Sequence, residues 1–227
     1  MEFTQLTITT TNTKATLLLN GFPIAEVKTS GFKSLPIDLY LLENNTLTIQ
    51  ATPEQNAHIT LRIATVAQGT IVDTRDTSPA LFNLDEDVPS EKTYNLTFAT
   101  PGKTLGKRIL GETITESQAI EYAKTLAQLI QNKKFDALAA HFQPKFEDYA
   151  KLYNSDPTKM TKEFSTFLND FTFTYNQNAI TAQPYCSERV YRLLHNNKTF
   201  ITAQKGTGEY KLEIYIANVN GTIKVVR

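Results

Sequence analysis

Residues 94–130 read YNLTFATPGKTLGKRILGETITESQAIEYAKTLAQLI, and the spacing of the apolar side chains changes within this stretch. Tyr94, Leu96 and Phe98 recur at every second position, which is the period of a β-strand with one buried face. Further on, apolar residues recur every three or four positions, as in an amphipathic helix. The segment between them holds a proline and three glycines, which are typical of a boundary between domains. We therefore expect two domains and a linker, with an all-β domain at 1–100, the linker at 101–111 and an α+β domain at 112–227.

Upstream of this stretch, short runs of alternating apolar residues predict six or more strands and no long helix. Asn20-Gly21 favours a tight hairpin because both residues readily take positive φ angles. Pro36 donates no backbone hydrogen bond, so its strand should start there or lie at a sheet edge. Such a series of short strands predicts a β-sandwich or a partly open barrel. The predicted runs are 6–8, 15–19, 35–41, 47–49, 59–63 and 94–98.

Part of this domain resembles a known family. Residues 19–24 (LNGFPI), 35–42 (LPIDLYLL) and 45–49 (NTLTI) resemble galactose-binding-like jelly rolls in their turns and in the apolar strand that follows. The resemblance implies a sandwich. Carbohydrate binding is disfavoured, because sugar sites generally offer exposed aromatic platforms and the chain has no tryptophan.

Helices are predicted to follow the linker. Thr115 with Gln118 three residues later forms a capping box, the signature of a helix start. Asp156-Pro157 begins another helix, since Asp is a favoured N-cap and Pro a favoured first residue. The apolar positions assigned to the buried helix faces are Ile120, Ala123, Leu126, Ala127, Ile130, Phe135, Leu138, Ala139, Phe142, Phe146, Tyr149, Ala150, Tyr153, Phe164, Phe167, Leu168 and Phe171. Antiparallel strands are then predicted at 171–175, 187–195, 199–205, 209–219 and 223–225, which completes an α+β layout.

This order of elements is similar to the nuclear transport factor two-like, or ketosteroid-isomerase-like, cone. The segment KFDALAAHF at 134–142 adds a local similarity. The resemblance implies helices packed on a curved antiparallel sheet. That superfamily includes enzymes, ligand binders and interaction modules, so the fold does not select a function.

Composition narrows the classes of function. Hydrophobic residues make up 41% and charged residues 20%, as in an ordinary globular protein. One cysteine and no secretory or membrane-spanning pattern lead us to expect a cytoplasmic protein. The first hundred residues hold six basic and eleven acidic residues, and the rest hold 17 and 12. This split could steer a charged partner, but no dense basic stripe suggests nucleic acid.

An enzyme of the cone type would need a general base and a polarising donor inside the cone. The candidates are Asp148, Tyr149 and Tyr191, with His141 and Tyr175 as further titratable groups. At a helix end, His141 is more simply explained as a cap on backbone carbonyls, and Cys186 as a structural thiol.

No metal or cofactor is expected from the sequence. The three histidines are widely separated. The acidic residues Asp73, Asp76 and 85–87 lack the spacing of a calcium loop.

In the predicted strand 209–219, the even-numbered apolar residues are assigned to the core. Lys211, Glu213 and Tyr215 should then face outward, with Arg189 and Tyr191 beside them. Because Arg and Tyr are enriched at binding hot spots, these five residues form the expected partner face. We therefore expect a non-enzymatic cytoplasmic binding protein, an immunity or antitoxin-type protein that covers a toxin or effector. The alternative is a cone-fold enzyme or carrier for a small apolar molecule, and the oligomeric state is left open.

Overall fold

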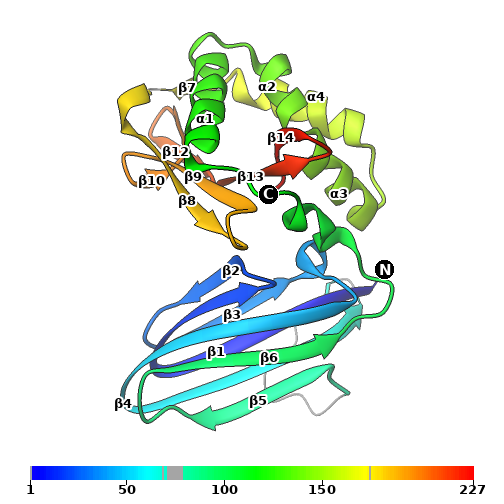
Figure 1. Cartoon of the computed structure of the whole chain (residues 1–227), viewed down its shortest axis with the longest axis vertical. Coiled ribbons are helices and arrows are strands. Elements are labelled where there is room, and N and C mark those ends of the chain that lie inside the picture. Colours follow the sequence, from blue (N-terminus) through cyan, green and yellow to red (C-terminus); the bar gives the residue numbers. More distant parts are fainter. Residues whose placement is uncertain (1, 68, 71–78, 174) are drawn as a thin grey trace. The chain divides into compact units, whose positions relative to one another are not determined.

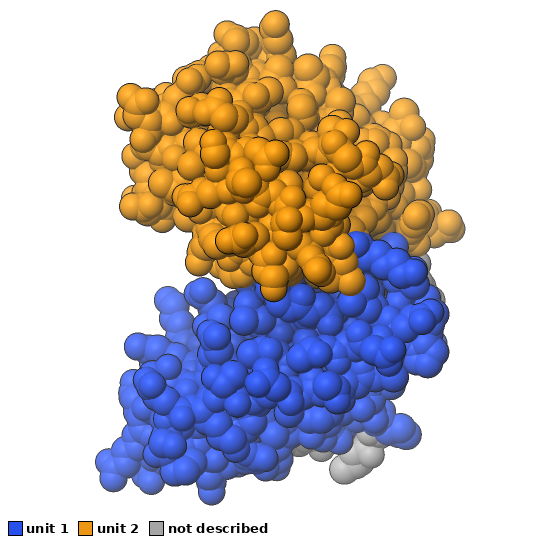
Figure 2. Space-filling model, in the orientation of Figure 1, with its two compact units in different colours: residues 1–107 blue, residues 108–227 orange. Residues whose placement is uncertain are grey.

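The structure, a computed structural model, describes residues 2–67, 69–70, 79–173 and 175–227. Over these residues it is a sheet-rich α+β protein with three antiparallel sheets (Figure 1). The chain divides into two compact units, residues 1–107 and 108–227 (Figure 2). Their boundary falls inside the segment 101–111 that was expected to link two domains. None of the described helices is long and apolar enough to cross a membrane.

In its described residues, unit 1 forms one six-stranded sheet in which two long strands, β1 and β4, pair with each other. β2 and β3 both pair with β1, and β5 and β6 both pair with β4. The strands are β1 (Glu2–Leu19), β2 (Phe22–Val27), β3 (Gly31–Pro36), β4 (Asn44–Ala67), β5 (Phe82–Asp87) and β6 (Lys92–Ala99), with a 3₁₀ turn η1 (Asp38–Tyr40) after β3.

The predicted separation of runs 6–8 and 15–19, and of 47–49 and 59–63, is wrong. The first pair belongs to β1 and the second to β4. Asn12 in β1 and Asn56 in β4 take positive φ angles of 49° and 57°, and the β1–β4 register shifts between Thr11 and Thr13. The irregularity changes the pairing without ending the strands. Side chains from both halves of β1 and β4 therefore join one hydrophobic cluster.

The predicted strand 35–41 is also wrong beyond Pro36. The chain turns there because the buried carboxylate of Asp38 accepts the backbone N–H of Thr4 (2.8 Å) and an Nζ hydrogen of Lys103 (2.6 Å). These two bonds to Asp38 stabilise the 3₁₀ turn η1, and the strand does not continue past Pro36. The edge position expected from Pro36 is confirmed, since β3 pairs only with β1 in the described part of the chain.

Four helices open unit 2, and the predicted starts are confirmed. Both halves of the capping box of Thr115 and Gln118 are formed. Asp156 accepts the backbone N–H of Thr158, and Pro157 opens the last helix. The helices are α1 (Glu116–Gln131), α2 (Phe135–His141), α3 (Gln143–Tyr153) and α4 (Pro157–Leu168). They follow η2 (Leu105–Leu110), a 3₁₀ segment that spans the boundary between the units.

The strands of unit 2 form two sheets where one curved sheet was expected. A five-stranded sheet has the order β10-β9-β13-β14 with β8 also on β9, and a three-stranded sheet has the order β12-β11-β7. The strands are β7 (Thr172–Phe173), β8 (Ile180–Tyr185), β9 (Val190–His195), β10 (Lys198–Thr199), β11 (Ile201–Lys205), β12 (Gly208–Leu212), β13 (Ile214–Val219) and β14 (Thr222–Val225), with a 3₁₀ turn η3 (Gln177–Ala179) before β8.

The chain passes between these two sheets at two breaks that the sequence did not predict. Leu212 pairs with Ile201 in one sheet, while Ile214 pairs with Leu193 in the other, so the expected strand 209–219 is interrupted at Glu213. The expected strand 199–205 is interrupted at the buried Phe200, whose carbonyl accepts the Tyr175 hydroxyl (2.8 Å). β8 was not predicted at all.

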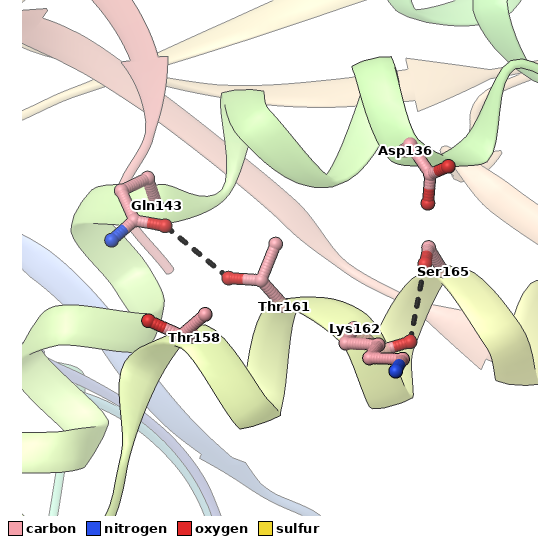
Figure 3. A pocket seen from close by; sticks show the side chains of 6 residues that line it. All are labelled: Asp136, Gln143, Thr158, Thr161, Lys162 and Ser165. Atoms are coloured by element: carbon pink, nitrogen blue, oxygen red, sulfur yellow. Dashed lines mark hydrogen bonds between the residues drawn. The ribbon is translucent and has the colours of Figure 1, made fainter.

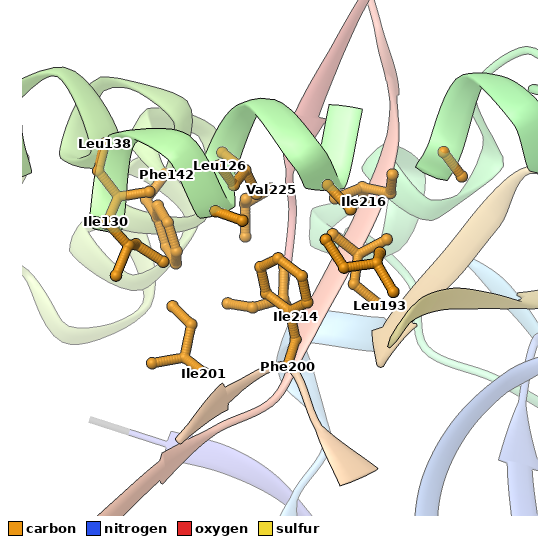
Figure 4. Close-up of a cluster of buried hydrophobic side chains, with 14 of the residues drawn as sticks. Leu126, Ile130, Leu138, Phe142, Leu193, Phe200, Ile201, Ile214, Ile216 and Val225 are labelled. Carbon is orange, nitrogen blue, oxygen red and sulfur yellow. The ribbon is translucent and has the colours of Figure 1, made fainter. Parts of the chain in front are cut away.

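The core of unit 2 lies between the helices and these strands, and α1 packs on β8 and β9. Its largest fully buried side chains include Phe142 and Phe200 (Figure 4). Phe142 therefore fills the interior, as expected. Phe167, which was assigned to a buried face, is 42% exposed instead, and Tyr153 is 41% exposed.

The glycines near the boundary serve close packing. A Cβ on Gly106 would collide with the carbonyl of Tyr40 in unit 1, and one on Gly111 with the carbonyl of Asn218 in unit 2. The backbone N–H of Gly106 also donates to Leu41 (2.9 Å). The expected linker is therefore not a free segment: Gly106 packs against unit 1, and Gly111 packs against unit 2.

Candidate functional site

Asp148 lies on the buried side of α3 and is only 1% exposed. One carboxylate oxygen accepts Arg227 Nη1 at 2.7 Å, and the other accepts Arg108 Nε at 2.9 Å. Both oxygens of this carboxylate are thus occupied by guanidinium groups through charge-assisted hydrogen bonds. It is poorly placed to exchange a proton with a substrate, so the geometry gives Asp148 a structural role.

The network around Asp148 continues along α3. Arg108 Nη2 donates to Glu147 Oε2 at 2.6 Å, and Gln143 Nε2 donates to Glu147 Oε1 at 3.3 Å. The hydrogen bond from Arg108 lowers the pKa of Glu147 and outweighs burial, which acts in the opposite direction. Nearby, burial and the charge of Arg227 lower the pKa of Lys145 to about 8. The ion pairs of Glu147 and Asp148 with the two arginines hold this face of α3 in place.

In the part of the chain that the structure describes, no hydrogen bond or ion pair joins the other two proposed catalytic residues, Tyr149 and Tyr191, to Asp148. Tyr191 packs in the hydrophobic core of unit 2. The ring of Tyr149 lies beside Tyr153, with centroids 5.9 Å apart, and Lys145 Nζ is 6.0 Å from the Tyr149 centroid. Burial raises the pKa of both Tyr149 and Tyr191, so each keeps its proton. The arrangement contains no paired base and donor among these three.

His141 forms a polar pair with a tyrosine of α1, in place of the expected cap on backbone carbonyls. Its Nδ1 lies 2.8 Å from the Tyr122 hydroxyl. Burial, and then the charge of Lys224, lower the pKa of His141, while burial raises the pKa of Tyr122. A neutral imidazole and a protonated phenol therefore share this hydrogen bond, whose direction depends on the imidazole tautomer.

Cys186 follows β8 in a turn and fits the expected structural role. Burial raises the pKa of its thiol to about 12, which leaves almost no thiolate for nucleophilic attack.

The acidic residues considered for calcium show a different arrangement. His58 of β4 lies between two carboxylates of β5, with Nε2 2.6 Å from Asp85 and Nδ1 2.9 Å from Asp87. Asp73 and Asp76 lie outside the described residues. Among the residues that are described, no group of three or more His, Cys, Asp or Glu side chains is placed to hold a metal ion.

The expected partner face is only partly exposed. Arg189, Lys211 and Glu213 are exposed, but the outward positions predicted for Tyr191 and Tyr215 are wrong. Tyr191 belongs to the core, and Tyr215 is only 7% exposed.

The break at Glu213 explains this outcome. Because Lys211 and Tyr215 belong to different sheets, the alternation along one strand does not carry across Glu213. The Tyr215 hydroxyl donates to Glu213 at 3.2 Å, and its ring lies 6.2 Å from that of Tyr185.

A cluster of aromatic side chains, which we call the aromatic patch, consists of Phe167, Phe171 and Tyr210. Its three centroid separations are 4.8 Å (Phe167–Phe171), 5.0 Å (Phe167–Tyr210) and 5.6 Å (Phe171–Tyr210). Phe167 is 42% exposed, and the other two rings are half-buried. Burial raises the pKa of Tyr210, which remains a neutral hydrogen-bond donor.

Charged groups border the aromatic patch. Lys205 Nζ lies 5.8 Å from the Phe171 centroid and donates to Asp170 at 2.6 Å. Tyr210 lies on β12, which pairs with β11 alone in the described residues and so presents an open edge. An exposed apolar cluster with a polar rim is typical of a binding surface. The sequence contained its residues, but helical spacing assigned Phe167 and Phe171 to the core.

A separate polar pocket of about 260 Å³ lies among α2, α3 and α4 (Figure 3). Its lining is made of short or charged polar side chains from the first turns of α2 and α3 and from one face of α4. The lining residues are Asp136, Gln143, Thr158, Thr161, Lys162 and Ser165. None of them was singled out from the sequence, since isolated polar residues at helix starts resemble ordinary solvated positions.

Comparisons with models of protein families, with curated proteins and with solved structures find no match for this chain.

Proposed function

We propose that this is a non-enzymatic binding protein whose aromatic patch contacts a protein partner. The observation that carries the proposal is the exposure of Phe167 within a cluster of three rings on the surface of unit 2. Full burial of a phenylalanine is worth roughly 1.5–3 kcal/mol, and Phe167 is 42% exposed, so a partner that covers it could recover about 1 kcal/mol. Tyr210 adds a hydroxyl that can hydrogen-bond while its ring is covered.

The positions and contacts of the proposed catalytic residues favour binding over catalysis. Asp148 is saturated by Arg108 and Arg227, and Tyr191 is part of the core. The alternative, a cone-fold enzyme or carrier for a small apolar molecule, has weaker support, because the pocket among α2, α3 and α4 is lined by polar residues.

The sharper form of the proposal is an immunity or antitoxin-type protein of the cytoplasm that neutralises a toxin or effector by covering it. Its support is the acidic excess of residues 1–100 and the basic excess of the remainder, which can orient a charged partner. The proposal includes the finer fold description, in which unit 1 is a β-sandwich like galactose-binding jelly rolls and unit 2 is a cone like nuclear transport factor two.

The test combines capture with a paired substitution. Tagged wild-type protein and the double variant Phe167→Ala/Tyr210→Ala are used to capture proteins from the native host, and bound proteins are identified by mass spectrometry. The affinity of the captured partner should then fall by about 2 kcal/mol or more, roughly 30-fold, in the double variant. If the partner is a toxin, co-expression with wild-type protein should restore growth of a sensitive host.

The matched control is Tyr153→Ala, which removes an exposed aromatic ring of α3 outside the patch. It should bind the partner as the wild type does. An unchanged affinity in the Phe167/Tyr210 double variant, with an unchanged circular dichroism spectrum, would exclude the aromatic patch as the contact. The exposed Arg189, Lys211 and Glu213 would then be tested next.

A further inference from the structure

The polar pocket of unit 2 is a candidate ligand site separate from the aromatic patch. Figure 3 shows the Asp136 side chain facing Ser165, and Thr161 and Gln143 joined by a hydrogen bond along one wall. Ser165 is only 5% exposed, so it forms part of the interior of the pocket.

One wall of this pocket is held in a fixed geometry. The hydroxyl hydrogen of Thr161 is shared between the Pro157 carbonyl (2.8 Å) and Gln143 Oε1 (3.2 Å), and Gln143 Nε2 donates to Glu147 at 3.3 Å. Glu147 is held in turn by Arg108, which also binds the buried Asp148. A chain of hydrogen bonds thus connects the pocket wall to the ion network of α3. Side chains supported in this way lose little further entropy when a ligand binds.

The two charged side chains that line the pocket, Asp136 and Lys162, make no ion pair with the described residues. No hydrogen bond or ion pair within the described part of the chain involves the side chains of Asp136 or Lys162, or the hydroxyl of Thr158. Asp136 and Lys162 carry opposite charges and line the same pocket, yet they do not bridge each other. Both side chains are exposed to solvent, so a ligand that carries both charges would replace water at both groups at once.

We propose that this pocket binds a small zwitterion, specifically a free α-amino acid with a short side chain. The ligand's ammonium group binds the Asp136 carboxylate. Its carboxylate binds the Lys162 ammonium through charge-assisted hydrogen bonds. The volume of about 260 Å³ lies below the roughly 300–1,000 Å³ of pockets for drug-sized ligands, which favours a single small molecule. Ser165 and Thr161 offer a polar lining to a short side chain.

The experiment uses the full chain labelled with ¹⁵N and titrated with glycine, L-alanine and L-serine. At least one of the three should shift the amide signals of residues 158–165 in a saturable manner. The amino acid that binds most tightly is then compared with its N-acetyl derivative, which lacks the ammonium group, and its amide, which lacks the carboxylate. Each derivative should bind at least tenfold more weakly.

Single substitutions assign the charges. Asp136→Asn and Lys162→Gln should each weaken binding of the amino acid at least tenfold. Lys159→Gln is the matched control, because Lys159 lies on the same helix and pairs with Glu163 outside the pocket (3.7 Å). It should leave the affinity unchanged.

Three results would overturn the inference: no saturable shift with any of the three amino acids, equal binding of either derivative, or an equal loss in the Lys159 control. Circular dichroism of each variant separates lost binding from lost folding. Because Asp136 and Lys162 lie outside the aromatic patch, this test can fail while the partner-binding proposal stands.

Discussion

Unit 1 and unit 2 each bury a carboxylate, but they neutralise it in different ways. In unit 1, Asp38 accepts one backbone N–H and the ammonium of Lys103, which is itself 39% exposed. In unit 2, Asp148 is held by Arg108 and by Arg227, whose side chain is only 3% exposed. Asp38 fixes a local turn after an edge strand, whereas Asp148 joins α3 to two segments distant in sequence.

This difference indicates how much each unit depends on its buried charge. Water can replace a partly exposed partner such as Lys103, so losing it should lower the free energy of unfolding only modestly. A buried guanidinium left without its carboxylate cannot be hydrated without opening the fold. Unit 2 should therefore be the more sensitive of the two to loss of a single charge.

The largest expected effect is that of Asp148→Asn. Removing the negative charge leaves the side chains of Arg227 and Arg108 less than fully compensated, which should lower the free energy of unfolding by about 3–5 kcal/mol. Calorimetry of the full chain measures it. The control Glu163→Gln removes a charge from an exposed pair with Lys159 and should change stability by less than about 0.5 kcal/mol. Equal effects of the two substitutions would show that the network contributes no more than a surface pair.

The next effect concerns where the chain can be divided. Fragments 1–107 and 108–227 should each fold when expressed alone, because each keeps its own core. A fragment ending at residue 100 loses the Lys103 ion pair with Asp38 and the Gly106 bond to Leu41, so it should be less stable than 1–107 by about 1–3 kcal/mol. Urea denaturation of the two fragments gives the difference.

Two results would contradict the prediction that the chain can be divided after residue 107. Unfolded spectra for both 1–107 and 108–227 would mean that the units stabilise each other. Equal midpoints for 1–100 and 1–107 would mean that residues 101–107 contribute nothing to unit 1.

How far the sequence predicted this molecule depends on the kind of signal. Local chemistry worked: Thr115 with Gln118 forms its capping box, and Asn20-Gly21 takes positive φ angles in the hairpin turn between β1 and β2. These features depend on interactions within four residues, so a short window of sequence contains their cause.

Long-range pairing was not predicted. Alternation in β1 and β4 identified the buried faces, but nothing local showed that two runs on either side of Asn12 or Asn56 form one strand. For the same reason the sequence missed the sheet change at Glu213, and with it the burial of Tyr215. The polar pocket forms where three helices meet, and the periodicity of a sequence does not predict contacts between helices.

The positive φ angle of Asn12 offers a smaller test within unit 1. Asn12→Val places a β-branched residue at φ 49°, which should cost about 1–2 kcal/mol of stability. Asn12→Gly tolerates that conformation and should remain within a few tenths of a kcal/mol of the wild type. Thermal unfolding by circular dichroism compares the two. If both variants lose the same stability, the hydrogen bond from Asn12 Nδ2 to Gln55 (3.0 Å), and not the backbone angle, accounts for the asparagine.

The smallest effects are those of two histidines, and they should have opposite signs in the two units. The hydrogen bond to Asp87, followed by the bond to Asp85, raises the pKa of His58 above 6.5 in unit 1. Its stabilisation is therefore fully present below pH 6.5 and is lost as pH rises through the folded pKa. Burial lowers the pKa of His141 in unit 2. The unfolded chain then takes up a proton first, so stability is lost as pH falls through 6.5.

Each histidine should contribute less than about 1 kcal/mol, because His58 is exposed and His141 is half-buried. NMR titration of the imidazole signals should place the two midpoints on opposite sides of 6.5. Urea denaturation at pH 5.5 and 7.5 should then show that His58→Gln removes a stabilisation that is larger at the lower pH. His141→Gln should remove a destabilisation that is larger at the lower pH. Midpoints on the same side of 6.5 would contradict the opposite environments of the two rings, one between carboxylates and the other against a phenol and Lys224.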